Sequence, residues 1–428
     1  MTDNHNRRPL LDSLVKSFEK VFKFPADYIV HAPGRVNIVG EHVDYSKYPV
    51  LPCALSTRFF GWAVGVKPSE VLNVSITHQD STFPTGSFGL DEIKGFQKTR
   101  EEKTFWFDYV LCGLRGAIEE YGDFPPCAIY MCGDGNVPLG SGLSSSSALV
   151  CASMLAGRLC FSKEELSDEE RTILGAKAAL AERYIGLNSG GMDQAISFGA
   201  KLGYVTKIDF YPSLHGEHHP LPTKTGIIVA NSLQAAHKAA SNAYNERVKE
   251  CSTASHLLSD LLEIPQQDTM REVQVVSGKT VAELLNMSQE LPPFVSEVGK
   301  VRDRAVHVFA EVLNVESAVN ACENNDFESL CISVNRSGIS LKENYECSSP
   351  ALDQLRSALL NAGCSAARLC GAGFGGCCIG LFDTTKLHAC DIISALETTY
   401  YSDKEYECFN DVCFEAVPGG PAGFFVLD

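Results

Sequence analysis

The chain has 428 residues, and its 36 Lys and Arg against 53 Asp and Glu give a formal net charge of −17. A content of 45% hydrophobic and 21% charged residues is ordinary for a globular protein and excludes collagen, a coiled coil and a mainly disordered chain. The length favours two domains, and the acidity argues against nucleic acid or an anionic membrane as the main partner, though not against a small anionic ligand.

Hydrophobic spacing predicts mixed elements in the first half of the chain. Apolar residues three and four apart indicate an opening helix over residues 10–22. Strands are expected at 28–31, 35–39, 59–67, 71–77, 127–132 and 203–210. Further helices are expected at 108–121 and 168–185, and another begins near Ser145.

The second half is richer in helix. Helices are expected at 233–262 (one or two), 280–289, 295–313, 327–343, 350–362 and 387–399, and strands at 226–230, 365–369 and 377–382. This mixture indicates an α/β or α+β fold. We place the domain boundary near residues 193–206, which gives domains of residues 1–200 and 201–428.

The 17 cysteines form no Cys-x-x-Cys pair and no cluster with zinc spacing. We expect reduced thiols, many of them buried as small hydrophobic side chains. The first eight residues are polar, and apolar runs such as 377–382 are too short to span a bilayer. A cytoplasmic protein is the simplest expectation.

A loop rich in glycine and serine spans residues 133–148 and precedes a helical pattern. Glycine lets backbone N–H groups approach a ligand, and a helix N-terminus offers free donors and partial positive charge to a phosphate. The loop has no Walker lysine, so it is not a P-loop. By itself, a flexible turn with an ordinary serine cap explains it equally well.

Three further segments carry polar groups. Arg35, Glu41, His42, Asp44 and Tyr45 crowd beside an apolar strand and suit a ligand with many hydroxyls, although a solvated turn explains any one of them. Glu182 and Asp193 offer a magnesium ligand and a proton acceptor, but an Asp after two glycines is more often a turn residue. The glycine-rich segment 371–376 is a weak dinucleotide fingerprint, because no βαβ unit surrounds it.

Together these segments resemble the galactokinase family of the GHMP kinase superfamily. The resemblance rests on Pro33–Asn37 with Gly40-Glu41-His42-x-Asp44-Tyr45, on the loop 138–146, on Gly191-Met192-Asp193-Gln194, on 371–376 and on 106–110, and it covers about residues 28–420. Gly190–Gln194 and residues 242–248 look like the eukaryotic branch, which includes galactokinases and N-acetylgalactosamine kinases.

The resemblance implies a two-domain GHMP-type fold. Its N-terminal domain has a mixed sheet and its C-terminal domain has helices over an antiparallel sheet, with the active site between them. It implies phosphorylation of the C1 hydroxyl of galactose by ATP with Mg²⁺. Asp193 and Arg35 match the family's catalytic positions. The sugar-binding positions are matched by these two residues and by Glu41, His42, Asp44, Gly190 and Tyr244. Nucleotide positions are Trp106, Pro138, Gly140, Ser141, Gly142, Leu143, Ser144, Ser145 and Ser146, and magnesium positions are Ser146 and Glu182.

Lys47 and Ser189 depart from the family pattern and leave the choice of sugar open, and Cys370 stands where threonine is frequent. An N-acetylgalactosamine kinase is the first alternative, and a non-catalytic sensor of galactose and ATP is the second. The uninterrupted serine loop, Asp193 and Arg35 favour an enzyme. We expect a monomer that binds the sugar and ATP but no nucleic acid and no membrane.

Overall fold

The computed structural model describes residues 3–99, 102–186, 190–234 and 239–427, with the side chains of residues 3–8 and 239–242 left aside. The first sheet has six strands in the order β12-β1-β2-β5-β3-β4. Only the β3–β5 pair is parallel, so the sheet is mixed. Its strands are β1 (Tyr28–Asn37), β2 (Pro52–Pro68), β3 (Asn73–His78), β4 (Gly86–Gly89), β5 (Cys127–Gly135) and β12 (Gly423–Val426).

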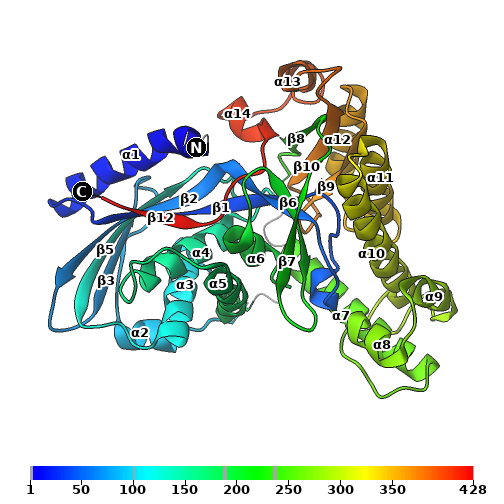
Figure 1. Cartoon of the computed structure of the whole chain (residues 1–428), viewed down its shortest axis with the longest axis horizontal. Coiled ribbons are helices and arrows are strands. Elements are labelled where there is room, and N and C mark those ends of the chain that lie inside the picture. The colour runs from blue at the N-terminus through cyan, green and yellow to red at the C-terminus, as the bar shows by residue number, and fades with distance from the viewer. Residues whose placement is uncertain (1–2, 100–101, 187–189, 235–238, 428) are drawn as a thin grey trace.

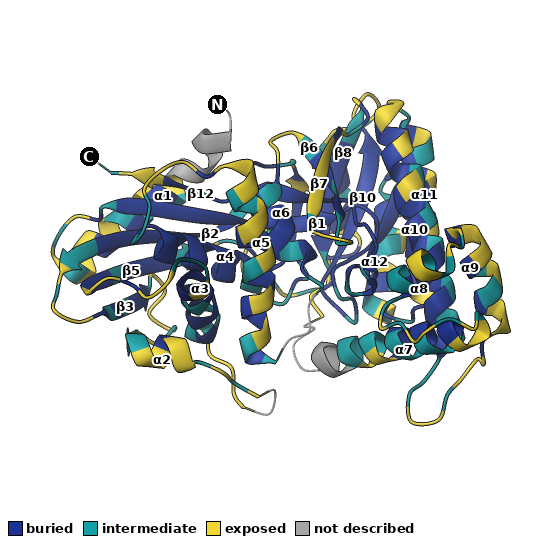
Figure 2. Ribbon diagram, turned by 60° about the horizontal axis from the view of Figure 1, so that its bottom comes forward, coloured by how far each residue is buried: buried dark blue, intermediate teal, exposed yellow. Residues whose placement is uncertain are grey.

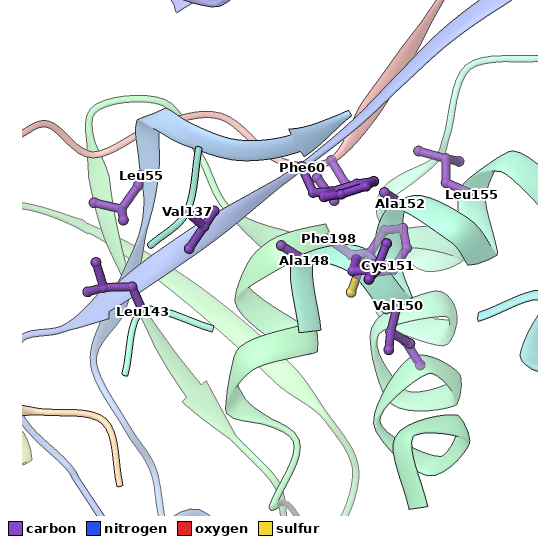
Figure 3. Close-up of a cluster of buried hydrophobic side chains, with 14 of the residues drawn as sticks. Leu55, Phe60, Val137, Leu143, Ala148, Val150, Cys151, Ala152, Leu155 and Phe198 are labelled. Carbon is purple, nitrogen blue, oxygen red and sulfur yellow. The ribbon is translucent and has the colours of Figure 1, made fainter. Parts of the chain in front are cut away.

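Helices cover both faces of this sheet (Figure 1). α1 packs against β2 and β5 on one face, and α4 packs against β1 and β2 on the other. Phe60 of β2 and Phe198 lie among Ala148, Cys151 and Ala152 of α4 in the buried core (Figure 3). The helices of this half are α1 (Asp3–Phe22), α2 (Leu90–Gly95), α3 (Trp106–Tyr121), α4 (Ser145–Arg158), α5 (Asp168–Ala181) and α6 (Met192–Gly199), with the 3-10 turns η1 (Asp44–Ser46) and η2 (Glu182–Ile185).

The second sheet is antiparallel, with the order β11-β8-β10-β9. α12 packs on β9 and β10, α11 packs on β9, and α10 runs beside α11 (Figure 1). The elements of this half are β8 (Thr225–Asn231), β9 (Ala366–Cys370), β10 (Cys377–Asp383), β11 (Cys413–Ala416), α7 (Ala239–Leu261), α8 (Met270–Ser277), α9 (Val281–Met287), η3 (Ser288–Glu290), α10 (Val301–Glu323), α11 (Phe327–Glu343), α12 (Pro350–Asn361), α13 (Ala389–Thr398) and α14 (Phe409–Val412).

A two-stranded hairpin, β6 (Tyr204–Asp209) with β7 (His215–Pro220), lies between the two sheets in the chain. The buried residues follow the strands and the helices packed on them, while α2 and α9 expose much of their surface (Figure 2). None of the helices in the described ranges is long and apolar enough to cross a membrane. All 17 cysteines are free, and Cys160, Cys390 and Cys408 are the three that are not buried.

The mixed and antiparallel sheets agree with the expected fold class. Several expected elements differ in extent, and the starts of two helices show the reasons. The helix expected from residue 295 begins at Val301, because Glu297 and Gly299 adopt positive φ angles of 62° and 130°. The helix expected from residue 233 begins at Ala239, and residues 235–238 lie outside the described part.

The boundary at residues 200 and 201 falls between α6 and β6 and stays a prediction. The chain nevertheless returns to its first sheet at its end. Strand β12 pairs antiparallel with β1, as Tyr28 opposite Val426 and His31 opposite Gly423 show (Figure 1). A division by sheets would therefore place residues 423–426 with the N-terminal unit.

Candidate active site

Arg35 and Asp193 come together from distant parts of the chain. Arg35 lies near the end of β1, and Asp193 lies in the first turn of α6. The guanidinium Nε donates to Asp193 Oδ1 at 2.8 Å, and Nη1 donates to the carbonyl of Gly142. Burial lowers the pKa of Arg35, but attraction led by Asp193 outweighs burial and raises this pKa overall. One fixed cation therefore joins the candidate catalytic carboxylate to the glycine and serine loop.

Asp44 lies beside this pair, at the start of η1. Its carboxylate accepts backbone N–H groups from Met192 and Tyr45, and Gly190 packs directly on it. A Cβ atom on Gly190 would lie 2.2 Å from Asp44 Cγ, so only glycine fits here. Burial raises the pKa of Asp44 to about 7, with Asp193 and Glu41 adding to the effect. Several carboxylates in one region suit a ligand that donates hydroxyl hydrogens.

Glu41 is buried and already held by the protein. Its Oε1 accepts the Gly371 N–H at 2.7 Å and faces Arg368 Nη2 at 3.0 Å. Burial raises the pKa of Glu41, and the nearby arginines Arg368 and Arg35 oppose that rise. The expected sugar contact therefore has a fixed orientation before any ligand binds.

His42 has partners at both ring nitrogens. Nε2 donates to the carbonyl of Ala372 at 3.1 Å, so Nδ1 accepts from the Tyr45 hydroxyl, also at 3.1 Å. Burial lowers the pKa of His42 to about 3, which keeps the ring neutral. The rings of Tyr244 and Tyr345 lie 5.5 and 4.6 Å from it, centroid to centroid. Contact between a sugar and His42 would use the ring face or replace one of these partners.

A cavity of about 470 Å³ adjoins these residues and is lined from both halves of the chain. Asp44, Gly190 and Gly191 line it together with Phe210 and Val248. Residues 187–189, including Ser189, lie outside the described part. Asp44 therefore borders a space large enough for a small ligand.

The loop before α4 presents a helix N-terminus without a cap. The helix begins at Ser145 as expected, but Ser144 has a φ of 64° and its hydroxyl accepts no bond from the helix. The alternative of an ordinary serine cap does not hold at Ser144, because the left-handed backbone turns this hydroxyl away from the first turn. The first N–H groups of α4 are thus left for a ligand, and the partial charge there favours phosphate.

Two neighbours fix the shape of this loop. Arg35 N donates to the carbonyl of Leu143 at 3.1 Å, and a Cβ on Gly34 would lie 2.6 Å from that oxygen. On the other side, Cys377 N donates to the carbonyl of Ser141 at 2.9 Å.

The late glycine segment 371–376 also lies against this loop. It joins the antiparallel neighbours β9 and β10 and belongs to no βαβ unit, as expected. A Cβ on Gly371 would lie 2.6 Å from the carbonyl of Gly142. The segment therefore supports the candidate phosphate loop.

Glu182 is the candidate metal ligand. Its Oε2 accepts the Ser147 hydroxyl at 3.1 Å and the Gln194 amide, and the Ser146 hydroxyl also bonds to it. Burial raises its pKa to about 7, and Asp193 adds to the rise. In the described ranges, no three His, Cys, Asp or Glu gather around a metal position. One carboxylate with hydroxyls fits Mg²⁺, which takes few protein oxygens together with substrate phosphates.

An aromatic cavity of about 210 Å³ lies beyond the start of α4. Phe60, Phe83 and Trp106 line it, with His78 and Asp134 as polar groups. Trp106 is fixed by its Nε1, which donates to the carbonyl of Pro84 at 2.8 Å. Flat apolar walls with a few polar groups suit a nucleotide base.

Sequence reasoning gave no role to several residues of this region. Ser147 and Gln194 hold Glu182, and Arg368 holds Glu41. Gln194 belongs to the quoted motif 191–194 and Arg368 lies three residues before the segment 371–376, so both positions were a usable signal. Ser147 was hidden as the last serine of a run of four.

Comparison with known proteins places the chain among similar sequences. A galactokinase galactose-binding signature matches residues 16–61, and the GHMP kinase N-terminal and C-terminal domains match residues 108–200 and 318–402. Galactokinase from Dictyostelium discoideum is 32% identical over 93% of this chain and 89% of its own length. Galactokinase from Haemophilus influenzae strain PittGG is 32% identical over 91% of this chain and 95% of its own.

Solved structures show the same fold. A Lactococcus lactis galactokinase complexed with galactose superposes with a TM-score of 0.76 at 23% identity, covering 97% of this chain and 99% of that one. The mevalonate kinase of Methanococcus jannaschii superposes less well, with a TM-score of 0.57 at 17% identity, covering 92% and 99%.

Proposed function

The chain belongs to the galactokinase family, and on that premise we propose that it transfers the γ-phosphoryl group of ATP to the C1 hydroxyl of α-D-galactose. The products are galactose 1-phosphate and ADP. The observation that carries the proposal is the contact of Arg35 with both Asp193 and Gly142, because it sets a proton acceptor beside a loop suited to phosphate.

Positioning and charge neutralisation dominate phosphoryl transfer. In this proposal Asp44 and Glu41 accept hydroxyl hydrogens of the sugar, and Tyr244 lies beside them. Asp193 accepts the hydrogen of the C1 hydroxyl, and Arg35 holds the Asp193 carboxylate in place and faces the developing charge. The free N–H groups at the start of α4 bind the phosphates, and the cavity at Trp106 takes the base.

Mg²⁺ would be held by Glu182 and the hydroxyl of Ser146, with Ser145 as the neighbouring candidate, and would neutralise phosphate charge when bound. Gln194 and Ser147 keep the Glu182 carboxylate oriented. We further propose a monomeric enzyme of the cytoplasm, for which 17 free cysteines are suited because that compartment keeps thiols reduced.

A kinase assay against several acceptors tests the proposal. ADP formation is measured with galactose, N-acetylgalactosamine, mevalonate and homoserine, each with and without Mg²⁺. We expect galactose to give the highest kcat/KM and the product to carry phosphate on C1. Faster turnover of N-acetylgalactosamine would contradict the choice of sugar, and galactose binding without ADP formation would indicate a sensor.

A further inference from the structure

Helix α10 reaches from the C-terminal half into the loop that carries the sugar-binding candidates. His307 and Glu311 lie one turn apart on this helix, and both are completely buried. Their side chains bond to the main chain of residues 40 and 41, which precede His42 and Asp44. Two residues of one half thus hold the backbone of the other.

Glu311 collects four hydrogen bonds. Its Oε1 accepts the N–H groups of Gly40 at 2.8 Å and Glu41 at 3.3 Å, and the Ser337 hydroxyl at 2.6 Å. Its Oε2 accepts the Asn314 amide at 3.2 Å. Gly40 has a φ of 103°, so the chain turns sharply at the point where Glu311 holds it.

His307 holds the same turn through its carbonyl. Nε2 donates to the carbonyl of Glu41 at 3.1 Å, and Nδ1 accepts from the Ser340 hydroxyl at 2.9 Å. The Tyr345 ring lies between His307 and His42, with centroids 4.3 and 4.6 Å away. Both the N–H and the C=O of Glu41 are therefore bonded to α10.

Arg368 extends this arrangement to the Glu41 side chain. Its guanidinium faces Glu41 Oε1 at 3.0 Å and Glu311 Oε1 at 3.8 Å, and Nη1 donates to the carbonyl of Ile38 at 3.2 Å. Arg368 and Glu311 are both without solvent exposure. In such an interior, an unpaired polar group is costly, so these contacts hold one arrangement firmly.

We infer that His307 and Glu311 are positioning residues for the sugar, which fix the Gly40–Glu41 turn and so the direction of the Glu41 carboxylate and the His42 ring. This inference rests on the proposed function. Neither residue touches the candidate phosphate loop or Asp193 in the bonds described above. Glu41 and His42 bond to Gly371 and Ala372, but His307 and Glu311 make no described bond to that segment, so we expect their effect on sugar affinity to exceed their effect on nucleotide affinity.

Glu311→Ala tests the inference, with Glu250→Ala as its matched control. Glu250 is also buried and bonded to an α10 arginine, Arg304, at 2.7 Å, but its described bonds do not reach residues 40–42. Glu311→Ala is expected to raise the KM for galactose about tenfold, the equivalent of roughly one buried hydrogen bond, with the KM for ATP within about twofold. Glu311→Gln, which keeps an acceptor, is expected to recover most of this loss, and Glu250→Ala to leave both KM values within about twofold.

Two serines of α11 keep the test open if Glu311→Ala does not fold. Ser337 donates to Glu311, whereas Ser333, one turn earlier and equally buried, donates to the carbonyl of Ser329 at 3.1 Å. Ser337→Ala is expected to raise the KM for galactose about two- to threefold, and Ser333→Ala to leave it unchanged. A galactose KM that responds equally to both serine variants would overturn the inference.

Hydrogen exchange separates this inference from the proposed function. The amides of Gly40 and Glu41 are expected to exchange at least about tenfold faster in Glu311→Ala than in wild type. If Glu311→Ala does not fold, Ser337→Ala takes its place. In Glu250→Ala, the exchange rates of these two amides are expected to equal those of wild type. This readout needs no turnover. A wild-type protein inactive on galactose would remove the proposed function, whereas unchanged exchange in the Glu311 variant would remove the positioning role.

Discussion

Burial sets the charge of individual residues in the candidate site. The pKa of Asp44 rises from 3.8 to about 7, and burial is the main cause. At pH values between these two pKa values, such a carboxyl group holds its proton in the folded protein and loses it in the unfolded chain. It therefore lowers the free energy of unfolding as the pH rises from about 4 to about 7. Asp383 shows the opposite case, because hydrogen bonds from Thr385 lower its pKa to about 2.

Asp44→Asn is accordingly expected to raise the melting temperature, and to raise it more at pH 8 than at pH 5. Asp383→Asn is expected to lower the melting temperature at pH 8, because the ionised Asp383 stabilises the folded state above its unfolded pKa. Thermal melts of both variants at the two pH values check these signs. A lower melting temperature for Asp44→Asn at pH 8 would contradict the assignment.

Under the proposed function, the titration of Asp44 also affects sugar binding. Protonated Asp44 loses acceptor capacity for sugar hydroxyls, so the kcat/KM for galactose is expected to fall as the pH drops below about 7. In Asp44→Asn, the KM for galactose should be at least about tenfold higher than in wild type at pH 8. A variant with the wild-type KM and pH profile would show that Asp44 does not contact the sugar.

The roles of some residues in this region could be predicted from the sequence, and the roles of others could not. Arg35, Asp44 and Asp193 stand in recognisable motifs, and the structure brings them together as a group. The partners His307 and Glu311 lie in an ordinary helical pattern, where a His and a Glu on a helix indicate nothing by themselves. Only the packing of α10 against residues 40–42 gives them a place.

At the scale of elements, two glycine-rich loops lie back to back. Gly371 has a φ of 88°, and a Cβ there would lie 2.6 Å from the carbonyl of Gly142. Gly278 also has a positive φ, 67°, but a Cβ on it would meet nothing within 4 Å. Substituting Gly278 therefore introduces backbone strain alone, whereas substituting Gly371 also displaces the candidate phosphate loop.

Gly371→Ala is expected to raise the KM for ATP at least about fivefold, because the added methyl group pushes the loop 140–142 away. Gly278→Ala should cost about 1 kcal/mol of stability and leave the KM for ATP unchanged. Steady-state kinetics with thermal melts measure both effects. Equal KM values for ATP in the two variants would rule out the supporting role of segment 371–376.

Elements with strong hydrophobic periodicity were predictable, and α11 runs over residues 327–343 as expected. Strand β7 was missed because its sequence, from His215 to Pro220, is polar and mostly exposed, and only pairing with β6 defines it. α8 was missed although Thr269 and Glu272 form a capping box that marks its start. Strand β7 depends on tertiary pairing and has no local signal, whereas the capping box of α8 could have been recognised in the sequence.

At the scale of the whole molecule, the C-terminal strand β12 pairs with β1 at the edge of the first sheet. Phe424 of β12 is buried in the core of the first sheet, whereas Phe425, on the opposite face, is 37% exposed and lies on His31. The last residues of the chain therefore stabilise the sheet that carries Arg35. This long-range pairing lies outside what local sequence patterns indicate.

Phe424→Ala is expected to destabilise the protein by about 3 kcal/mol, and Phe425→Ala by clearly less, since large-to-small changes cost most in a packed core. Denaturant unfolding of the two variants measures the difference. Equal losses would contradict the role of β12 as an integral strand.

The net charge of −17 remains compatible with an anionic cosubstrate at this scale. In the proposed site, the uncapped start of α4, Arg35 and a divalent cation at Glu182 supply positive charge locally. A broad basic surface is therefore unnecessary for binding ATP.

The most direct test of this account is galactose-dependent ADP formation by wild type and Asp193→Ala, measured side by side with galactose binding and a thermal melt. Wild type is expected to turn over galactose, and Asp193→Ala to remain folded and bind the sugar with kcat reduced at least about 10²- to 10⁴-fold. A folded Asp193→Ala variant that retains turnover within tenfold of wild type would contradict it.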